Sequence, residues 1–114
     1  MQITVFTPTY NRAHLLPRLY KSLCAQTCKD FEWVIVDDGS VDDTKSIIDG
    51  FINDNSITIR YFCQENGGKH RAINRGVKEA KGNLFFIADS DDILPEQSIE
   101  TVLKQYEKAK NQAP

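Results

Sequence analysis

The chain has 114 residues, of which 40% are hydrophobic and 26% are charged, and its formal net charge is −2. This composition is ordinary for a globular protein with one core and excludes an intrinsically disordered chain. The slight negative charge argues against a nucleic-acid partner, whose phosphates require a basic surface.

Four short β-rich runs are predicted, at 2–6, 31–37, 57–63 and 83–88, and each is followed by a stretch with helical spacing of its apolar residues. The second and fourth runs are almost continuously apolar, which is typical of strands covered by helices on both faces. The pattern therefore predicts an α/β fold with a mainly parallel sheet.

The helices that follow these strands each present one apolar face. The first is expected to begin near His14, the second to have Ser40 or Asp42 as N-cap, the third to cover 69–81, and the last to begin near Pro95. The positions expected to pack on the sheet are Leu15, Leu19 and Leu23, then Ile47, Ile48, Phe51 and Ile52, then Ile73, Val77 and Ala80, and finally Ile99, Val102, Leu103 and Tyr106.

Polar clusters follow all four predicted strands, at 7–12, 37–40, 65–71 and 89–92. In a parallel sheet with right-handed crossovers, the carboxyl ends of the strands lie along one edge, and ligands bind outside that edge. We therefore expect the four clusters to converge on one site.

The last cluster contains three carboxylates, Asp89, Asp91 and Asp92, at the end of an apolar strand. Such a group suits a hard divalent cation such as Mg²⁺ or Mn²⁺, which also binds substrate phosphates. The alternative is a solvated acidic turn that caps the next helix. A calcium-binding EF-hand loop is excluded, because Ile93 and Leu94 stand where that loop needs Asp or Asn and then Gly.

Two other clusters have chemistry that suits a nucleotide. A carboxylate within 37–40 can accept a hydrogen bond from the ring N–H of uracil, although these residues could instead cap the second helix. Lys69 and Arg71 lie at a predicted helix N-terminus, which favours a diphosphate, although such side chains are often only solvated. A P-loop is excluded because no Gly stands five positions before Gly68 and His70 replaces the required Ser or Thr.

These motifs together resemble the N-terminal half of the family 2 glycosyltransferases, enzymes of the GT-A fold that transfer a sugar from a nucleotide diphosphate. The resemblance covers essentially the whole chain, and its joint order and spacing are specific. Its landmarks are at 7–12, 22–23, 26–27, 31–32, 36–40, 43–44, 66–68, 72, 74–76, 80–82, 89–92 and 95. It implies a truncated, Rossmann-like α/β/α sandwich, with 1–114 as a single nucleotide-diphospho-sugar-binding domain.

The resemblance also implies roles for individual residues. The segment 7–10 would line a uridine pocket, Asp38 would bind the base, Asp91 would bind the metal, Asp89 would lie near the ribose, and Asp92 would be an additional contact. The nucleotide-binding candidates are Thr7, Pro8, Thr9, Tyr10, Arg12, Asp38, Gly68, Lys69, Arg71, Asp89 and Ser90. The metal candidates, for Mn²⁺ or Mg²⁺, are Asp91, Asp89 and Asp92.

The expected activity is metal-dependent, inverting transfer of a sugar from a UDP-sugar to an acceptor hydroxyl. In the family, a second half supplies the general base and the surface for a saccharide or lipid-linked acceptor, so we expect the base to lie beyond residue 114 and these residues alone to be inactive. One alternative is a non-catalytic nucleotide-sugar-binding module. A response-regulator receiver is disfavoured, because the third strand runs into 64–66 without a phosphoacceptor Asp.

Location and thiol chemistry are also predicted. No apolar run approaches the roughly 20 residues that span a bilayer, and no secretory signal pattern is found at the N-terminus. We expect a cytoplasmic protein, either free or peripheral at the inner membrane face. Cys24, Cys28 and Cys63 do not have zinc-site spacing and are expected to be buried free thiols.

Overall fold

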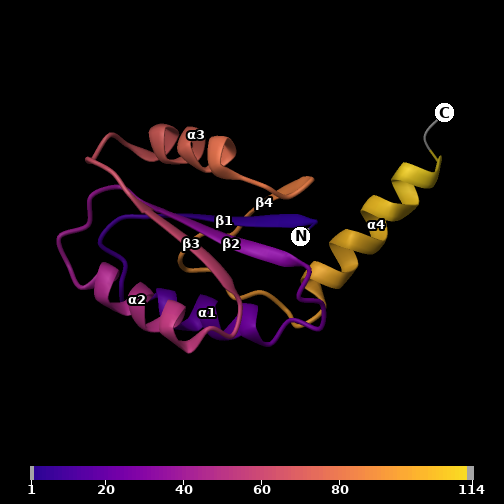
Figure 1. Ribbon diagram of the computed structural model, residues 1–114, viewed down its shortest axis with the longest axis horizontal. Helices are drawn as coiled ribbons and strands as arrows, with labels where there is room; N and C mark the ends of the chain where they lie inside the picture. Colours follow the sequence, from indigo (N-terminus) through magenta and orange to yellow (C-terminus); the bar gives the residue numbers. More distant parts are fainter. Residues whose placement is uncertain (1, 113–114) are drawn as a thin grey trace.

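The computed structural model describes residues 2–112, which form a sheet of four parallel strands in the order β3-β2-β1-β4 (Figure 1). Strands and helices alternate along the chain. They are β1 (Ile3–Thr9), α1 (Leu16–Cys24), β2 (Phe31–Asp37), α2 (Thr44–Asp54), β3 (Thr58–Cys63), α3 (Lys69–Glu79), β4 (Leu84–Ile87) and α4 (Ser98–Gln112). The predicted α/β class and the parallel sheet are confirmed.

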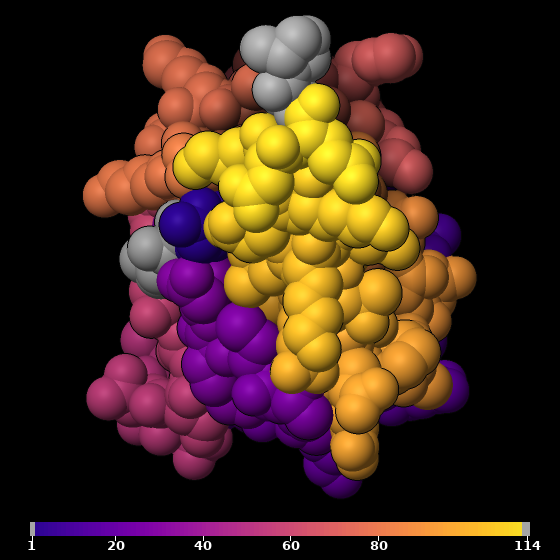
Figure 2. Space-filling view, turned by 90° about the vertical axis from the view of Figure 1, so that its right-hand side faces the viewer, coloured from indigo at the N-terminus to yellow at the C-terminus, as the bar shows by residue number. Residues whose placement is uncertain are grey.

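Helices cover both faces of the sheet. The helix α3 lies on one face and α1 and α2 lie on the other (Figure 1), which confirms the α/β/α arrangement. The last helix, α4, lies at the end of the sheet where the strands begin, and Figure 2 shows it covering that end of the molecule beside the start of β1. The opposite end of the sheet, where the strands stop, is left open for a site.

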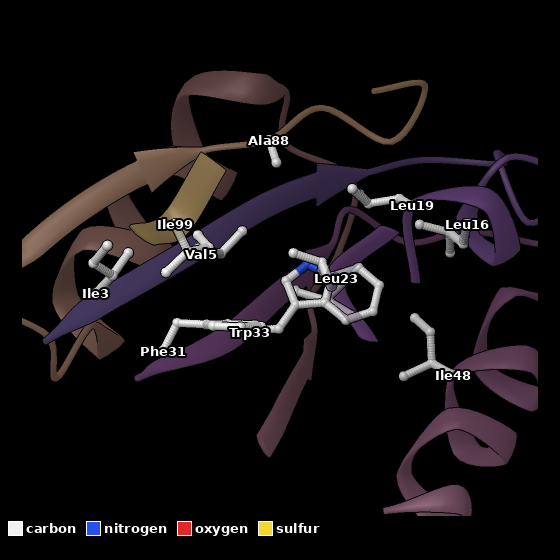
Figure 3. Packing of buried hydrophobic residues seen from close by; sticks show 11 residues of the cluster. Ile3, Val5, Leu16, Leu19, Leu23, Phe31, Trp33, Ile48, Ala88 and Ile99 are labelled. Atoms are coloured by element: carbon white, nitrogen blue, oxygen red, sulfur yellow. The ribbon is translucent and has the colours of Figure 1, made fainter. Parts of the chain in front are cut away.

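The larger core cluster lies between the sheet and the layer of α1 and α2, and α4 adds Ile99 to it. Trp33 of β2 is fully buried at the centre of this cluster (Figure 3), and its indole N–H donates to Thr7 Oγ1 at 2.9 Å. A smaller cluster, formed by Phe6, Val34, Val36 and Ala72, lies between the sheet and α3. The two cores hold the strand ends in fixed positions.

The strand β1 continues to Thr9, three residues beyond the predicted end at Phe6. Residues 7–9 pair with β2, where Pro8 lies opposite Val36. On its other side, β1 pairs with β4 only as far as Phe6. Because no strand flanks Pro8 on that side, its missing N–H leaves no ladder bond unmade there.

The starts of three helices differ from the prediction. The helix α1 begins at Leu16, with Leu15 as its N-cap, and buries Leu16 with the predicted Leu19 and Leu23. The N-cap of α2 is Asp43, although the Asp42 carboxylate accepts bonds from the backbone N–H and hydroxyl of Thr44. The helix α4 begins at Ser98, because 95–98 form a separate turn closed by a bond from Ser98 N to the Pro95 carbonyl.

The buried face of α3 is also different, since Val77 is exposed and Ala72 and Gly76 face the sheet. A Cβ added to Gly76 would lie 2.2 Å from the Phe6 ring, so only a residue without a side chain fits this approach. The helix ends at Glu79, two residues before its predicted end. Small residues, not large apolar ones, therefore bring α3 onto the sheet.

The cysteines are free thiols, as predicted, but their burial was overestimated. Cys24 and Cys28 are half-buried and Cys63 is exposed. Cys63 is the last residue of β3, which is an edge strand of the sheet, so its side chain lacks a covering neighbour.

Candidate functional site

A pocket of about 530 Å³ lies at the carboxyl edge of the sheet and is formed by the segments that follow all four strands. This volume is within the usual range for small-molecule sites. The lining residues are Pro8, Thr9, Tyr10, Arg12, Asp38, Asn66, Gly68, Lys69, Ala72, Asp89, Ser90 and Asp91. The central strand β1 has β2 on one side and β4 on the other, so the pocket lies where the strand order reverses, the usual ligand position in open α/β sheets.

Most of the candidate residues named from the sequence line this pocket, but Thr7, Arg71 and Asp92 do not. The buried Thr7 donates its hydroxyl to the Ala88 carbonyl at 2.6 Å and so ties β1 to the segment after β4. Arg71 folds back against Gly67, where an added Cβ would lie 2.5 Å from its side chain. Asp92 accepts a bond from the Asp89 N–H at 2.8 Å. Thr7 is therefore buried beneath the site, whereas Arg71 and Asp92 are exposed outside the pocket lining.

Two lining residues, Asn66 and Ala72, were not among the sequence candidates for the site. Asn66 belongs to the segment before α3, and Ala72 lies in the first turn and a half of that helix. The landmark pattern included both positions, but no chemical argument distinguished them. Their place in the lining depends on how closely α3 approaches β1.

The Asp38 carboxylate joins the segment after β2 to the start of α3. Its Oδ1 accepts bonds from Gly67 N at 2.9 Å and Gln64 Nε2 at 3.3 Å, and its Oδ2 accepts one from Gly68 N at 2.9 Å. A carboxylate offers about four lone-pair positions, so Oδ2 retains one for another donor. Burial tends to raise the pKa of Asp38, but these bonds and the charge of Arg71 outweigh it and hold the pKa below its usual value.

Gly68 can donate its N–H to Asp38 because of its backbone conformation. It is the N-cap of α3 and has a φ of 94°, in the region that residues with a side chain rarely adopt. This conformation directs its N–H toward Asp38 and starts the helix at Lys69. The Gly67-Gly68 pair thus gives the helix N-terminus a fixed place at the pocket.

The neighbouring Asp37 has a supporting role. Its Oδ1 accepts a bond from Ser40 N at 2.9 Å, and its Oδ2 accepts one from the Tyr61 hydroxyl at 2.6 Å. Burial, followed by this bond and the Asp37 charge, raises the pKa of Tyr61 well above its usual value. Because α2 is capped at Asp43, the alternative that 37–40 serve as its N-cap is wrong.

The segment after β1 is fastened to the segment after β2 by bonds that the sequence did not reveal. Asn11 N donates to Ser40 Oγ at 2.8 Å, Val41 N donates to Asn11 Oδ1 at 2.8 Å, and Ala13 N donates to Asp42 Oδ2 at 3.1 Å. Asn11 has a positive φ of 51°, which Asn tolerates better than most residues. These bonds fix the turn that carries Tyr10 to the pocket rim.

Thr9 lines the pocket and carries a buried hydroxyl. The residue is 4% exposed, and its Oγ1 has no hydrogen-bond partner among the described residues. Buried polar atoms are almost always hydrogen-bonded, so an unpaired one in a pocket wall is a candidate ligand contact.

The acidic cluster places Asp89 and Asp91 in the pocket lining and Asp92 in the turn behind them. Asp89 Oδ1 lies 3.6 Å from Lys69 Nζ. Within residues 2–112, no group of three His, Cys, Asp or Glu side chains is arranged to hold a metal ion. Mg²⁺ commonly uses only one or two carboxylates together with substrate phosphates, and Asp89 and Asp91 fit that chemistry. The cluster does not cap α4, where Gln26 Oε1 accepts the Ile99 N–H.

The fold and the pocket define an α/β domain that binds its ligand at the carboxyl edge of a parallel sheet. The chain belongs to glycosyl transferase family 2, whose sequence model matches residues 4–113. The resemblance identified from the sequence is thereby confirmed. Among the helices of residues 2–112, none is long and apolar enough to cross a membrane.

Three known proteins illustrate the relationship. Glycosyltransferase GlyG of Streptococcus pneumoniae is 39% identical over 104 residues, which are 90% of this chain and 34% of that protein. S. aureus TarS 1-349 in complex with UDP-GlcNAc has a TM-score of 0.84 and 29% identity, over 95% of this chain and 32% of that one. Mannosyltransferase PcManGT from Pyrobaculum calidifontis, in complex with GDP-Man and Mn²⁺, has a TM-score of 0.78 and 30% identity, over 82% of this chain and 28% of that one.

These similarities confirm the GT-A-like α/β fold. Both solved structures named above hold a nucleotide sugar. The chain spans about a third of the length of each of these proteins.

Proposed function

We propose that residues 1–114 form the donor-binding domain of a glycosyltransferase, which holds a UDP-sugar in the pocket at the carboxyl edge of the sheet. The observation that carries this proposal is the convergence of the segments after all four strands on one pocket. One side of the pocket offers Asp38 and the Thr9 hydroxyl, and the other offers the N-terminus of α3 with the carboxylates of the acidic cluster. A nucleotide diphosphate likewise carries a hydrogen-bonding base at one end and a charged diphosphate at the other.

The base would lie between Thr9 and Asp38. The remaining acceptor position on Asp38 suits a ring N–H, and the unpaired Thr9 hydroxyl suits a neighbouring carbonyl of the base. Uracil and guanine present a ring N–H beside a carbonyl, whereas cytosine and adenine present a ring acceptor there. Tyr10, Pro8 and Arg12 would form the rim around the nucleoside.

The diphosphate would lie between α3 and the acidic cluster. The N-terminus of α3, which begins at Lys69, offers the N–H groups of its first turn and the positive charge of the Lys69 side chain. Asp91 and Asp89 would hold a divalent cation, Mn²⁺ or Mg²⁺, with Ser90 between them and Asp92 fixing the turn. When bound, such a cation neutralises the charge that grows on the leaving diphosphate. The Mn²⁺ named with PcManGT supports this assignment.

The whole protein would transfer the sugar with inversion to a hydroxyl of a saccharide or lipid-linked acceptor. In the pocket, the side chains of this chain would bind the donor, orient its diphosphate and leave the sugar at the open edge. The general base and the acceptor surface would come from outside these residues. GlyG and TarS 1-349, each about three times the length of this chain, support such a division.

Calorimetric titration of UDP into the chain, with Mn²⁺ and then with EDTA, tests the proposal. CDP and ADP serve as controls for the base, and GDP distinguishes the two bases that offer a ring N–H. We expect binding that requires Mn²⁺ and follows the order UDP, then GDP, with CDP and ADP much weaker. Equal binding of all four nucleotides, or none at all, would contradict the proposed donor site.

The Thr9 hydroxyl gives a sharper test of base recognition. Thr9→Val keeps the shape of the side chain and removes the unpaired hydroxyl, so UDP should bind about tenfold more weakly. Thr58→Val, at an exposed position of β3, is the matched control and should leave UDP affinity unchanged. Wild-type affinity in Thr9→Val would exclude this hydroxyl from the base contact.

A further inference from the structure

The pocket contains an ion pair that joins two of its walls. Lys69, the first residue of α3, lies with its Nζ 3.6 Å from Oδ1 of Asp89, which follows β4. Both side chains are accessible, with 64% and 47% of their surfaces exposed. Within residues 2–112, the other ion pairs lie outside the pocket lining.

This pair places a positive charge where the proposed cation would bind. A divalent cation bonds a carboxylate oxygen at about 2.1 Å, so one on Asp89 Oδ1 would lie within about 6 Å of Lys69 Nζ. At that separation, the repulsion between a dication and an ammonium group is appreciable even in water. The cation must therefore displace the ammonium group or bind against its charge.

From this geometry we infer that the Lys69 ammonium group lowers the affinity of Asp89 for divalent cations until a nucleotide diphosphate binds. We call this the guarding role of Lys69. The phosphates bring negative charge that attracts the ammonium group away from Asp89 and supplies further oxygen ligands for the cation. Cation and nucleotide then bind cooperatively, and each raises the affinity of the other by the same factor. This inference deepens the proposed function and rests on it for the nucleotide, but its cation step can be measured separately.

The alternative is that the pair only stabilises the fold. Accessible ion pairs contribute little to stability, because solvent screens them and both side chains lose freedom. A merely structural pair would not make the affinity for a cation depend on Lys69. Replacing Lys69 therefore separates the two readings, and a melting curve shows that the variant is folded.

The experiment measures Mn²⁺ binding to the chain by electron paramagnetic resonance, first without nucleotide and then with saturating UDP. Lys69→Met removes the guarding charge. Lys45→Met is the matched control, because Lys45 is also paired with an aspartate, Asp49 at 3.4 Å, but lies on α2 outside the pocket. Both variants change the net charge equally.

Without nucleotide, Lys69→Met should bind Mn²⁺ about three- to tenfold more tightly than the wild type, while Lys45→Met should match the wild type. The factor by which UDP strengthens Mn²⁺ binding should be smaller in Lys69→Met by a similar amount. Equal or weaker Mn²⁺ binding by Lys69→Met without nucleotide would overturn the inference. If Lys69→Met gains Mn²⁺ affinity but no protein responds to UDP, the guarding role stands and the proposed donor site fails.

Discussion

Replacing Asp38 with Asn tests whether this carboxylate holds the start of α3 in place. Asp38 is only 7% exposed and accepts backbone bonds from Gly67 and Gly68, one on each oxygen. An Asn side chain has one acceptor oxygen, and its NH₂ group would face one of these N–H donors. At least one buried N–H would therefore lose its partner.

The size of the effect follows from those bonds. An unpaired buried donor costs about 1–3 kcal/mol, and the remaining bond loses its charge assistance, so we expect Asp38→Asn to lower the free energy of unfolding by about 2–3 kcal/mol. For a domain of this length, that corresponds to a fall in melting temperature of about 8–12 °C. Thermal unfolding followed by circular dichroism at pH 7 measures it.

The pH dependence has a defined sign. Because the folded pKa of Asp38 lies below its unfolded value of about 3.9, the stabilisation is complete above that pH and is lost as pH falls through the folded pKa. The difference in stability between the wild type and Asp38→Asn should stay constant from pH 7 to about pH 4 and shrink below it. A difference that instead grew on acidification would refute the assignment.

Asp49→Asn is the control for removal of an aspartate charge. Asp49 is exposed on α2 and forms an accessible ion pair with Lys45, so the melting temperature should change by less than about 2 °C. If Asp38→Asn behaved like this control at pH 7, the bonds from Gly67 and Gly68 would contribute nothing measurable to stability, and Asp38 would not hold the start of α3 in place.

Two further predictions concern the cation and the packing of α3. Asp91→Ala should abolish the Mn²⁺-dependent part of UDP binding in calorimetry, whereas Asp49→Ala should retain it; intact metal-dependent binding in Asp91→Ala would remove Asp91 from the metal site. Gly76→Ala should lower the free energy of unfolding by about 1–3 kcal/mol, because its Cβ would meet the Phe6 ring at 2.2 Å. Gly50→Ala, in the middle of α2 where the added Cβ would meet no packing neighbour within 4 Å, should instead stabilise the protein by about 0.5–1 kcal/mol. Denaturant unfolding compares the two, and equal effects would contradict the packing argument.

The strands could be predicted best where the sequence pattern was continuous. The apolar run of β2 ends abruptly at the two aspartates, and its observed bounds are the predicted ones, Phe31–Asp37. The end of β1 could not be predicted, because Thr7, Pro8 and Thr9 have no strong strand pattern of their own. Their pairing with β2 decides their conformation, and that partner lies 28 residues away.

The place of the candidate site could be predicted, because the loops after parallel strands meet at the carboxyl edge of the sheet. This convergence depends on the strand arrangement and not on how side chains pack. Positions that depend on close packing were missed. Ala72 and Gly76 carry little hydropathy signal, yet they form the buried face of α3, whereas the more apolar Val77 is exposed. Thr7 was expected to contact a ligand, but its hydroxyl donates to the Ala88 carbonyl and accepts from the Trp33 indole N–H.

The position of β1 between β2 and β4 has a consequence for how the protein is made. Within residues 1–114, β1 is translated before the other strands although it lies inside the sheet, and Ile3 pairs with Leu84, which is translated 81 residues later. At about 5–20 residues per second, β1 waits roughly 4–16 seconds for this neighbour. During that interval its backbone donors and acceptors on one side are without their native strand, so a chaperone that recognises extended apolar segments would find its best opportunity at β1 of the nascent chain.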